Sequence, residues 1–168
     1  HKAGHAIQLF DKSRGSGGRM SSKRSDVGVL DLGAQYFTAR DRRFVDEVQL
    51  GQANGWAVEW EPHLYQYKNG QLTPSPDEQT RWVGTPRMSA LWRHLAEGLE
   101  TSFERRAKQV LAGRDGWRVA CEDGGALGPF DAVAVATPSA QAVPLLEAVP
   151  ALASRAAEAE VEPCWAAM

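Results

Sequence analysis

A short apolar segment that ends in aspartate and runs into a glycine-rich loop constrains this chain most. Residues 6–11 read Ala-Ile-Gln-Leu-Phe-Asp and predict a strand, whereas residues 12–22 predict a loop rich in glycine, serine and basic side chains. In open α/β sheets, a carboxylate at the carboxyl end of a strand can accept hydrogen bonds from both hydroxyls of a ribose. Asp11 is therefore a candidate ribose ligand, although an aspartate at this position can equally serve the turn itself.

The loop that follows Asp11 has the residue types that bind a pyrophosphate. Arg14 and Arg19 frame Gly15, Gly17 and Gly18. Neighbouring glycines let main-chain N–H groups approach phosphate oxygens, and a guanidinium offers a fork of donors that matches them. An ordinary flexible loop would also be rich in glycine and serine, but arginines at both ends favour the phosphate interpretation.

A third segment, residues 30–37, predicts a contact with a flat ring. It reads Leu-Asp-Leu-Gly-Ala-Gln-Tyr-Phe. Gly33 and Ala34 would let the main chain lie against a ring, with Gln35 and Tyr36 facing that ring or a substrate. The alternative is a strand end with buried aromatic side chains, and the residues alone leave both interpretations open. Together the three segments indicate a dinucleotide cofactor.

The rest of the chain predicts a mixture of helices and strands. Apolar residues at helical spacing predict helices at residues 41–49, 89–99 and 140–148. The apolar side of the second helix consists of Leu91, Trp92, Leu95 and Leu99, which we expect in the core. Alternating residues predict strands at 56–60, 64–68 and 71–73, the last two joined by an Asn69-Gly70 turn. Further strands are predicted at 101–105, 108–112, 117–122 and 130–136, the last apolar without alternation, as in a covered parallel sheet.

Composition excludes several functional classes. Nineteen Lys and Arg against 21 Asp and Glu give a net charge of −2, without the strongly basic balance of a nucleic-acid binder. No apolar run approaches the length of a membrane span, so we expect no membrane partner. The four histidines and two cysteines show no metal-ligand spacing, so we expect no metal site. Two cysteines are too few for a disulfide framework, which favours a reducing compartment and a cytoplasmic location.

The three segments resemble the flavin-containing amine oxidase superfamily. The sequences of residues 11–21 and 31–37 are most similar to those of bacterial renalase-like FAD-dependent oxidoreductases. Residues Ala136-Thr137-Pro138 resemble the segment where the chain of those proteins returns to the cofactor. The resemblance implies an α/β fold. In it, a Rossmann-like FAD-binding domain, incomplete at its N-terminus, is interleaved with an antiparallel β substrate domain.

The same resemblance implies FAD as cofactor and assigns roles to individual residues. Asp11 would bind the adenosine ribose, and the main chain of Val110 would meet the adenine. Arg14, Gly18 and Arg19 would hold the pyrophosphate and its surroundings, and Ala34, Gln35 and Tyr36 would approach the isoalloxazine. The complete predicted cofactor-binding set is Asp11, Lys12, Arg14, Gly17, Gly18, Arg19, Met20, Ala34, Gln35, Tyr36, Val110, Ala136, Thr137 and Pro138.

The resemblance also implies how the chain is divided. The predicted domains are residues 1–50 and 85–148 for FAD binding, 51–84 for the substrate-domain sheet, and 149–168 for the start of the return to the substrate domain. The family's first strand and G-x-G-x-x-G turn would lie upstream of His1. We therefore expect an internal piece of a longer protein that binds FAD poorly and is inactive alone.

The predicted activity is oxidation of a small molecule by hydride transfer to the flavin. The resemblance implies a dihydronicotinamide dinucleotide isomer as donor and O₂ as acceptor. An amine substrate and a non-catalytic dinucleotide-binding module remain as alternatives. No catalytic side chain is assigned, because flavin oxidation needs little side-chain acid or base help. Aromatic residues that could line a pocket for a flat substrate, or merely pack, are Tyr36, Trp60, Tyr65, Tyr67 and Trp82.

Overall fold

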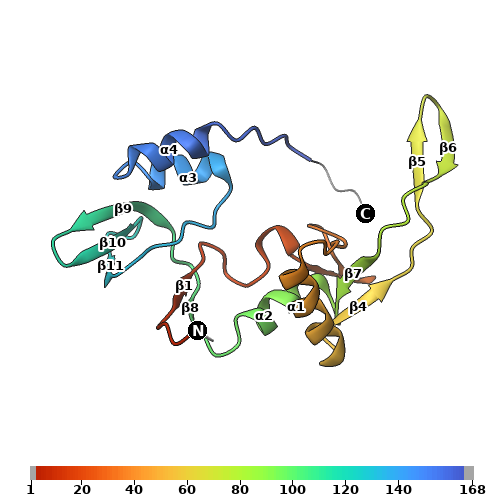
Figure 1. The fold of residues 1–168 in the computed structure, drawn as a ribbon, viewed down its shortest axis with the longest axis horizontal. Helices are drawn as coiled ribbons and strands as arrows, with labels where there is room; N and C mark the ends of the chain where they lie inside the picture. The colour runs from red at the N-terminus through yellow and green to blue at the C-terminus, as the bar shows by residue number, and fades with distance from the viewer. Residues whose placement is uncertain (1–2, 165–168) are drawn as a thin grey trace. The chain divides into compact units, whose positions relative to one another are not determined.

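The structure is a computed structural model that describes residues 3–164. These residues form two compact units (Figure 1). The first unit contains residues 3–15 and 98–164, and the second contains residues 16–97. Residues 165–168, the end of the predicted segment 149–168, lie outside the described residues. These units are a division by contacts, and the division into FAD-binding and substrate domains remains a prediction.

The first unit begins with a short parallel strand pair that carries Asp11 at its end. Strand β1 (Gln8–Phe10) runs beside β8 (Glu100–Ser102), with Leu9 opposite Thr101. Both strands are shorter than the predicted segments 6–11 and 101–105. The chain leaves β8 at residue 103 because Glu104 takes a φ of 56° and donates its main-chain N–H to Ser13 O at 3.0 Å. This bond ties the loop after β8 to the loop after β1.

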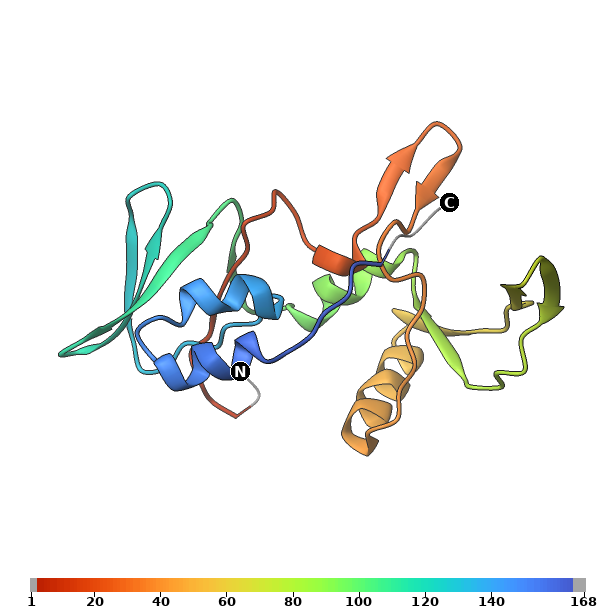
Figure 2. The same cartoon turned by 90° about the horizontal axis from the view of Figure 1, so that it is seen from above.

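An antiparallel sheet and two helices complete the first unit (Figure 2). The strands are β9 (Ala107–Gly113), β10 (Gly116–Cys121) and β11 (Ala126–Phe130), with β10 in the centre. Val110 and Val119 lie opposite each other and are buried. Helix α3 (Ser139–Leu145) packs against β9 and against α4 (Pro150–Ala157). The predicted helix at residues 140–148 thus ends early, and Pro150 begins a second helix.

One predicted strand of this unit does not form. Residues 131–136 belong to no strand, and β11 ends at Phe130, the residue at which we predicted this strand to begin. A strand is stable only when a neighbour completes its hydrogen bonds. The described residues supply no such neighbour here, because β11 is an edge strand bonded to β10 and the parallel pair consists of β1 and β8 alone.

The second unit is built from short antiparallel pairs and two helices. The elements are η1 (Gly18–Met20), β2 (Lys23–Ser25), β3 (Gly28–Leu30), α1 (Arg42–Ala53), β4 (Ala57–Trp60), β5 (Tyr65–Lys68), β6 (Gln71–Pro74), β7 (Arg81–Gly84) and α2 (Met88–Leu95). The pairs are β2 with β3, β4 with β7, and β5 with β6. The predicted Asn69-Gly70 turn is confirmed: both residues have positive φ, 52° and 80°, as this hairpin turn requires.

Helix α1 confirms the predicted helix at residues 41–49 and extends it. Asp41 caps the helix, because its Oδ1 accepts a hydrogen bond from Arg43 N at 2.9 Å. Val48 and Gly51 face inward. A Cβ at Gly51 would lie 2.5 Å from the Trp56 ring, so only glycine lets the helix rest on that ring.

The core of the second unit lies under α2. Ala57, Met88 and Leu91 are buried, with Met20, Phe37, Trp56 and Val83 packed around them. The prediction for this helix was wrong at its C-terminal end, because α2 stops at Leu95 rather than 99. Gly98 has a φ of 76°, which a continuing helix does not allow. Leu95 is consequently 57% exposed instead of buried.

Candidate functional site

In the first unit, the main chain and side chain of Asp11 are both fixed at the end of β1. Its N–H donates to Ser102 O and its carbonyl accepts from Arg105 N, both at 3.0 Å. Its Oδ1 accepts from Ser13 N at 2.8 Å, so the turn role considered above is realised by one oxygen. Within residues 3–164, Oδ2 has no hydrogen-bond partner. A held carboxylate with one oxygen available can accept hydrogen bonds from a diol.

The other predicted cofactor residues of this unit lie on one strand and in two loops. Lys12 Nζ donates to Gln141 Oε1 at 3.0 Å, which brings Lys12 to the first turn of α3, just after Pro138. Ala136 and Thr137 are exposed in the chain that leads to this helix. Val110 is buried in β9, an edge strand of its sheet, and Arg14 is exposed in the loop after β1.

In the second unit, the glycine loop is shaped by two residues with positive φ. Gly17 is buried with a φ of 125°, and a Cβ there would lie 3.1 Å from Ser21 Cα. Gly18 has a φ of 49° and open space at the position of a Cβ. The main-chain N–H groups of Gly18 and Arg19 make no hydrogen bond to another described residue. These donors and the exposed Arg19 side chain are the groups that an anion requires.

The structure joins this loop to the segment predicted to meet the flavin. Ala34 N donates to Arg19 O at 2.8 Å, and Gly33 N donates to Ser21 O at 3.3 Å. A Cβ at Gly33 would lie 2.0 Å from Arg19 O, so the close approach requires glycine. Ala34, Gln35 and Tyr36 follow directly and are exposed. The predicted phosphate loop and flavin segment are therefore neighbours.

A polar cluster that we did not predict connects Ser22 and Asp31, one from each segment, to the start of α2. Ser22 Oγ donates to Asp31 Oδ1 at 2.5 Å, and Met88 N at the start of α2 donates to the same carboxylate at 3.3 Å. Ser89 N donates to Ser22 Oγ at 3.2 Å. Asp31 is thus a cap for α2 supplied from a distant segment. No local pattern could reveal it, because Asp31 and Met88 are 57 residues apart.

Tyr36 and Trp60, two of the predicted substrate residues, form an aromatic group, and Arg81 lies against its Tyr36 ring. The rings of Tyr36 and Trp60 are 5.7 Å apart and tilted by 41°, and they are 37% and 39% exposed. Arg81 Cζ lies 5.1 Å from the centre of the Tyr36 ring. Trp60 and Arg81 are directly opposite in the β4–β7 pair, so their side chains share a face. Arg81 was not predicted as a site residue.

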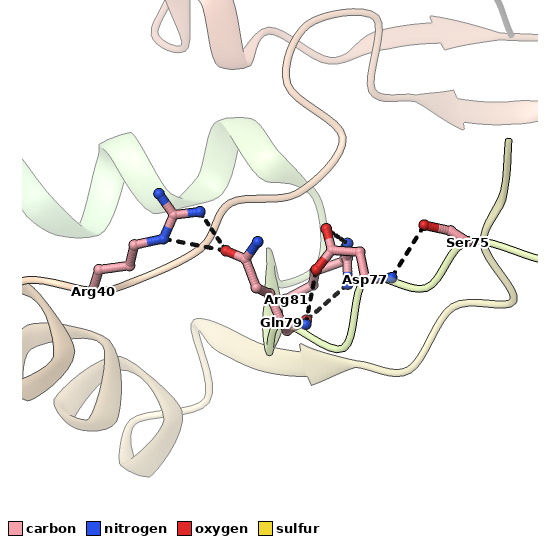
Figure 3. Close-up of polar contacts among 5 residues, drawn as sticks. All are labelled: Arg40, Ser75, Asp77, Gln79 and Arg81. Atoms are coloured by element: carbon pink, nitrogen blue, oxygen red, sulfur yellow. Dashed lines mark hydrogen bonds and ion pairs between the residues drawn. The ribbon is translucent and has the colours of Figure 1, made fainter.

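Arg81 is buried and held by a short polar network (Figure 3). Its Nη2 donates to Asp77 Oδ2 at 2.6 Å, and its Nη1 donates to Gln79 O at 2.7 Å. The main-chain N–H of Gln79, which donates to Asp77 Oδ1, is the largest cause that lowers the pKa of Asp77, and the Arg81 charge adds to it. Arg40 in turn donates to the Gln79 side chain.

The other predicted substrate residues do not join this aromatic group. Trp82 lies opposite Glu59, so its side chain leaves the other face of the β4–β7 pair from Trp60. Its main chain exchanges two hydrogen bonds of 2.9 Å with Phe37. Tyr65 and Tyr67 are 59% and 75% exposed on β5. An open pocket that shares Arg40 and Gln79 with the Arg81 network is lined by Thr38, Ala39, Arg40, Gln79 and Thr80, none of them predicted.

The available groups fit the parts of FAD that the resemblance assigns to them. The acceptor Asp11 Oδ2 suits ribose hydroxyls, the N–H groups of Gly18 and Arg19 suit a pyrophosphate, and the exposed Tyr36 ring suits a flat ring system. Within the described part of the chain, no group of three or more His, Cys, Asp or Glu could hold a metal ion. Nor is any helix of residues 3–164 long and apolar enough to span a membrane.

Two models of known families match the chain. The model described as an NAD(P)-binding Rossmann-like domain matches residues 1–48, the range that holds Asp11, the glycine loop and Tyr36. The model described as flavin containing amine oxidoreductase matches residues 61–166, which is more than half of the chain. The chain therefore belongs to the flavin containing amine oxidoreductase family, and its cofactor is FAD.

Proposed function

We propose that this protein is a renalase-like oxidase that takes a hydride from a dihydronicotinamide dinucleotide isomer and passes the electrons to O₂. The chemistry that bound FAD would supply is acceptance of a hydride from the donor, followed by transfer of two electrons and two protons, one of them from solvent, to O₂, which is reduced to hydrogen peroxide. The observation that carries the proposal is the exposed pair of Tyr36 and Trp60 beside the segment of Ala34 and Gln35. Such a surface favours a donor with a planar ring over a flexible aliphatic donor.

The chain's own residues then bind the cofactor and orient the donor. Asp11 would accept hydrogen bonds from the adenosine ribose, and Arg14 and Arg19 would neutralise the pyrophosphate. Tyr36 and Trp60 orient the donor ring, because hydride transfer depends on alignment of the reacting atoms. The donor gives up a hydride directly, so the reaction needs no side chain to remove a proton first. We accordingly assign no catalytic acid or base.

Anaerobic mixing of the FAD-loaded protein with two panels of compounds tests this function. The panels are dihydronicotinamide dinucleotide isomers and primary amines, and the measurement is bleaching of the visible flavin absorbance. We expect rapid bleaching by at least one dihydronicotinamide isomer, return of absorbance when O₂ is admitted, and formation of hydrogen peroxide. Bleaching by amines alone would assign the protein to amine oxidation, and no bleaching by either panel would leave a non-catalytic binding module.

Amine oxidation is the second candidate function, because the matching family is described by that chemistry. An amine donor must reach the flavin uncharged, and a nearby base or apolar surroundings would favour that form. The exposed aromatic pair supplies apolar surface for such a donor as well. The two panels separate the candidates directly.

Composition supports the remaining parts of the proposal. The small negative net charge favours a small-molecule partner over nucleic acid, and we propose neither a nucleic-acid nor a membrane partner. Two cysteines in 168 residues motivate a cytoplasmic location. Fractionation of the native cells with detection of the protein would test that location.

A further inference from the structure

Burial of the charged Arg81 side chain costs desolvation energy, and a gain in fold stability does not account for it. The residue is 4% exposed, and its Nε is buried without a hydrogen-bond partner among the described residues. A buried ion pair usually stabilises a fold no better than well-packed apolar side chains, and an unpaired buried donor adds a further cost. An arginine held in this way therefore points to a task beyond packing.

The contacts of Arg81 show what that task is. Its guanidinium lies 5.1 Å from the centre of the Tyr36 ring, within the range of a cation–π interaction. Asp77 and Gln79 O bind Nη2 and Nη1, so the guanidinium cannot turn away from the ring. Asp77 is itself held by Gln79 N at 3.0 Å (Figure 3). A continuous chain of contacts thus runs from Asp77 through Arg81 to Tyr36.

The main chain around Tyr36 is held by the same strand. Phe37, the next residue, exchanges two main-chain hydrogen bonds of 2.9 Å with Trp82, the neighbour of Arg81 on β7. Trp60, opposite Arg81, meets the Tyr36 ring at 5.7 Å. β7 therefore holds the backbone next to Tyr36 through Trp82 and contacts the ring through Arg81, while Tyr36 remains 37% exposed.

We propose that Arg81 is a positioning residue that sets the orientation of the Tyr36 ring and thereby the affinity for a planar donor. This inference rests on the proposed function for the identity of the donor, but the orientation of Tyr36 can be tested without it. Arg81 acts through Tyr36 and makes no contact with the donor. Its loss should raise KM and leave kcat nearly unchanged, because it removes binding that the ground state and transition state share.

The experiment is a double-mutant cycle on the FAD-loaded protein with the variants Arg81→Met, Tyr36→Leu and both together. We expect Arg81→Met to raise KM for the donor by about threefold to thirtyfold, in the range of a cation–π contact, with kcat changed by less than about twofold. In the Tyr36→Leu background, Arg81→Met should change KM by less than about twofold. Arg81→Lys keeps the charge and should recover part of the affinity.

Near-ultraviolet circular dichroism reports on the rings whether or not the protein turns over a donor. We expect Arg81→Met and Tyr36→Leu to remove the same coupled aromatic band, which arises from the tilted Tyr36–Trp60 pair. Arg118→Met is the matched control, because Arg118 forms an exposed ion pair with Asp115 at 2.8 Å. This control should leave the band and KM unchanged.

Three results would overturn the proposal. They are an aromatic band that survives Arg81→Met, a KM that does not change, and a KM that rises equally in the Tyr36→Leu background. If Arg81→Met does not fold, Arg81→Lys and Asp77→Asn replace it in the cycle, with smaller changes expected in the same direction. A parent protein whose flavin no dihydronicotinamide bleaches refutes the proposed function instead, and the band then decides the role of Arg81.

Discussion

At the scale of single residues, Gly33 controls how closely the two predicted cofactor segments approach. Its position allows Ala34 N to donate to Arg19 O at 2.8 Å. Any Cβ at residue 33 would lie 2.0 Å from that carbonyl oxygen, an overlap with backbone that no side-chain rotation relieves. The requirement for glycine here comes from space, because Gly33 does not have a positive φ.

We therefore predict that Gly33→Ala separates the glycine loop from residues 34–36. The expected result is a loss of about 2–4 kcal/mol in the free energy of unfolding and weaker retention of FAD. Urea denaturation and flavin absorbance after dialysis measure the two effects. Gly15→Ala is the matched control for the free energy of unfolding alone, because Gly15 belongs to the predicted phosphate loop but a Cβ there meets nothing within 4 Å and its φ is not positive. Equal behaviour of both variants would refute the close approach at Gly33.

At the scale of elements, local patterns predicted what local interactions decide. The Asn69-Gly70 turn and the start of α1 at Asp41 depend on neighbours in sequence, and both predictions are confirmed. Residues 131–136 were wrongly predicted as a strand, because a strand depends on a partner that the apolar run cannot specify. Within the candidate site, the irregular chain at residues 12–17 was predictable from its glycines and serines, whereas its binding of a phosphate stays a prediction. The Asp31 cap of α2 and the Arg81 contact were not, because their partners lie far along the chain.

The hydrogen bonds of Asp41 at the first turn of α1 should make the free energy of unfolding depend on pH in the acidic range. The hydrogen bond from the Arg43 side chain, followed by that from the Arg43 main chain, holds the pKa of Asp41 below its ordinary value of 3.8. A carboxyl whose pKa is lower in the folded state stabilises the fold above the unfolded pKa. That contribution disappears as the pH falls through the folded pKa. The acid limb of the stability curve should therefore steepen below about pH 4.

Asp41→Asn isolates this contribution, because asparagine keeps a capping oxygen but carries no titratable charge. We expect the variant to lose less stability than the parent between about pH 5 and pH 2 and to keep α1 helical by circular dichroism. Asp26→Asn is the control, because Asp26 is exposed in the turn between β2 and β3. Identical pH curves for parent and Asp41→Asn would show that the charge at Asp41 does not contribute.

At the scale of the whole molecule, the predicted cofactor residues are divided between the two compact units. Asp11, Val110 and Pro138 belong to the first, whereas Arg19 and Tyr36 belong to the second. A small molecule is recognised by a few polar groups, and different elements can present them. The sequence therefore predicts which groups bind the cofactor. It does not predict how much each unit contributes to the affinity for FAD.

A pair of substitutions, one in each unit, measures those contributions. We predict that Asp11→Ala and Arg19→Ala each weaken FAD binding by about 1–3 kcal/mol, because each removes a charge-assisted partner of the cofactor. If both residues bind the same FAD molecule without touching each other, the losses in the double variant should add. Equilibrium dialysis with flavin fluorescence measures the dissociation constants, and Arg24→Ala, an exposed arginine of β2, should leave them unchanged. A loss confined to one of the two variants would restrict the cofactor site to that unit, and no loss in either would remove both residues from it.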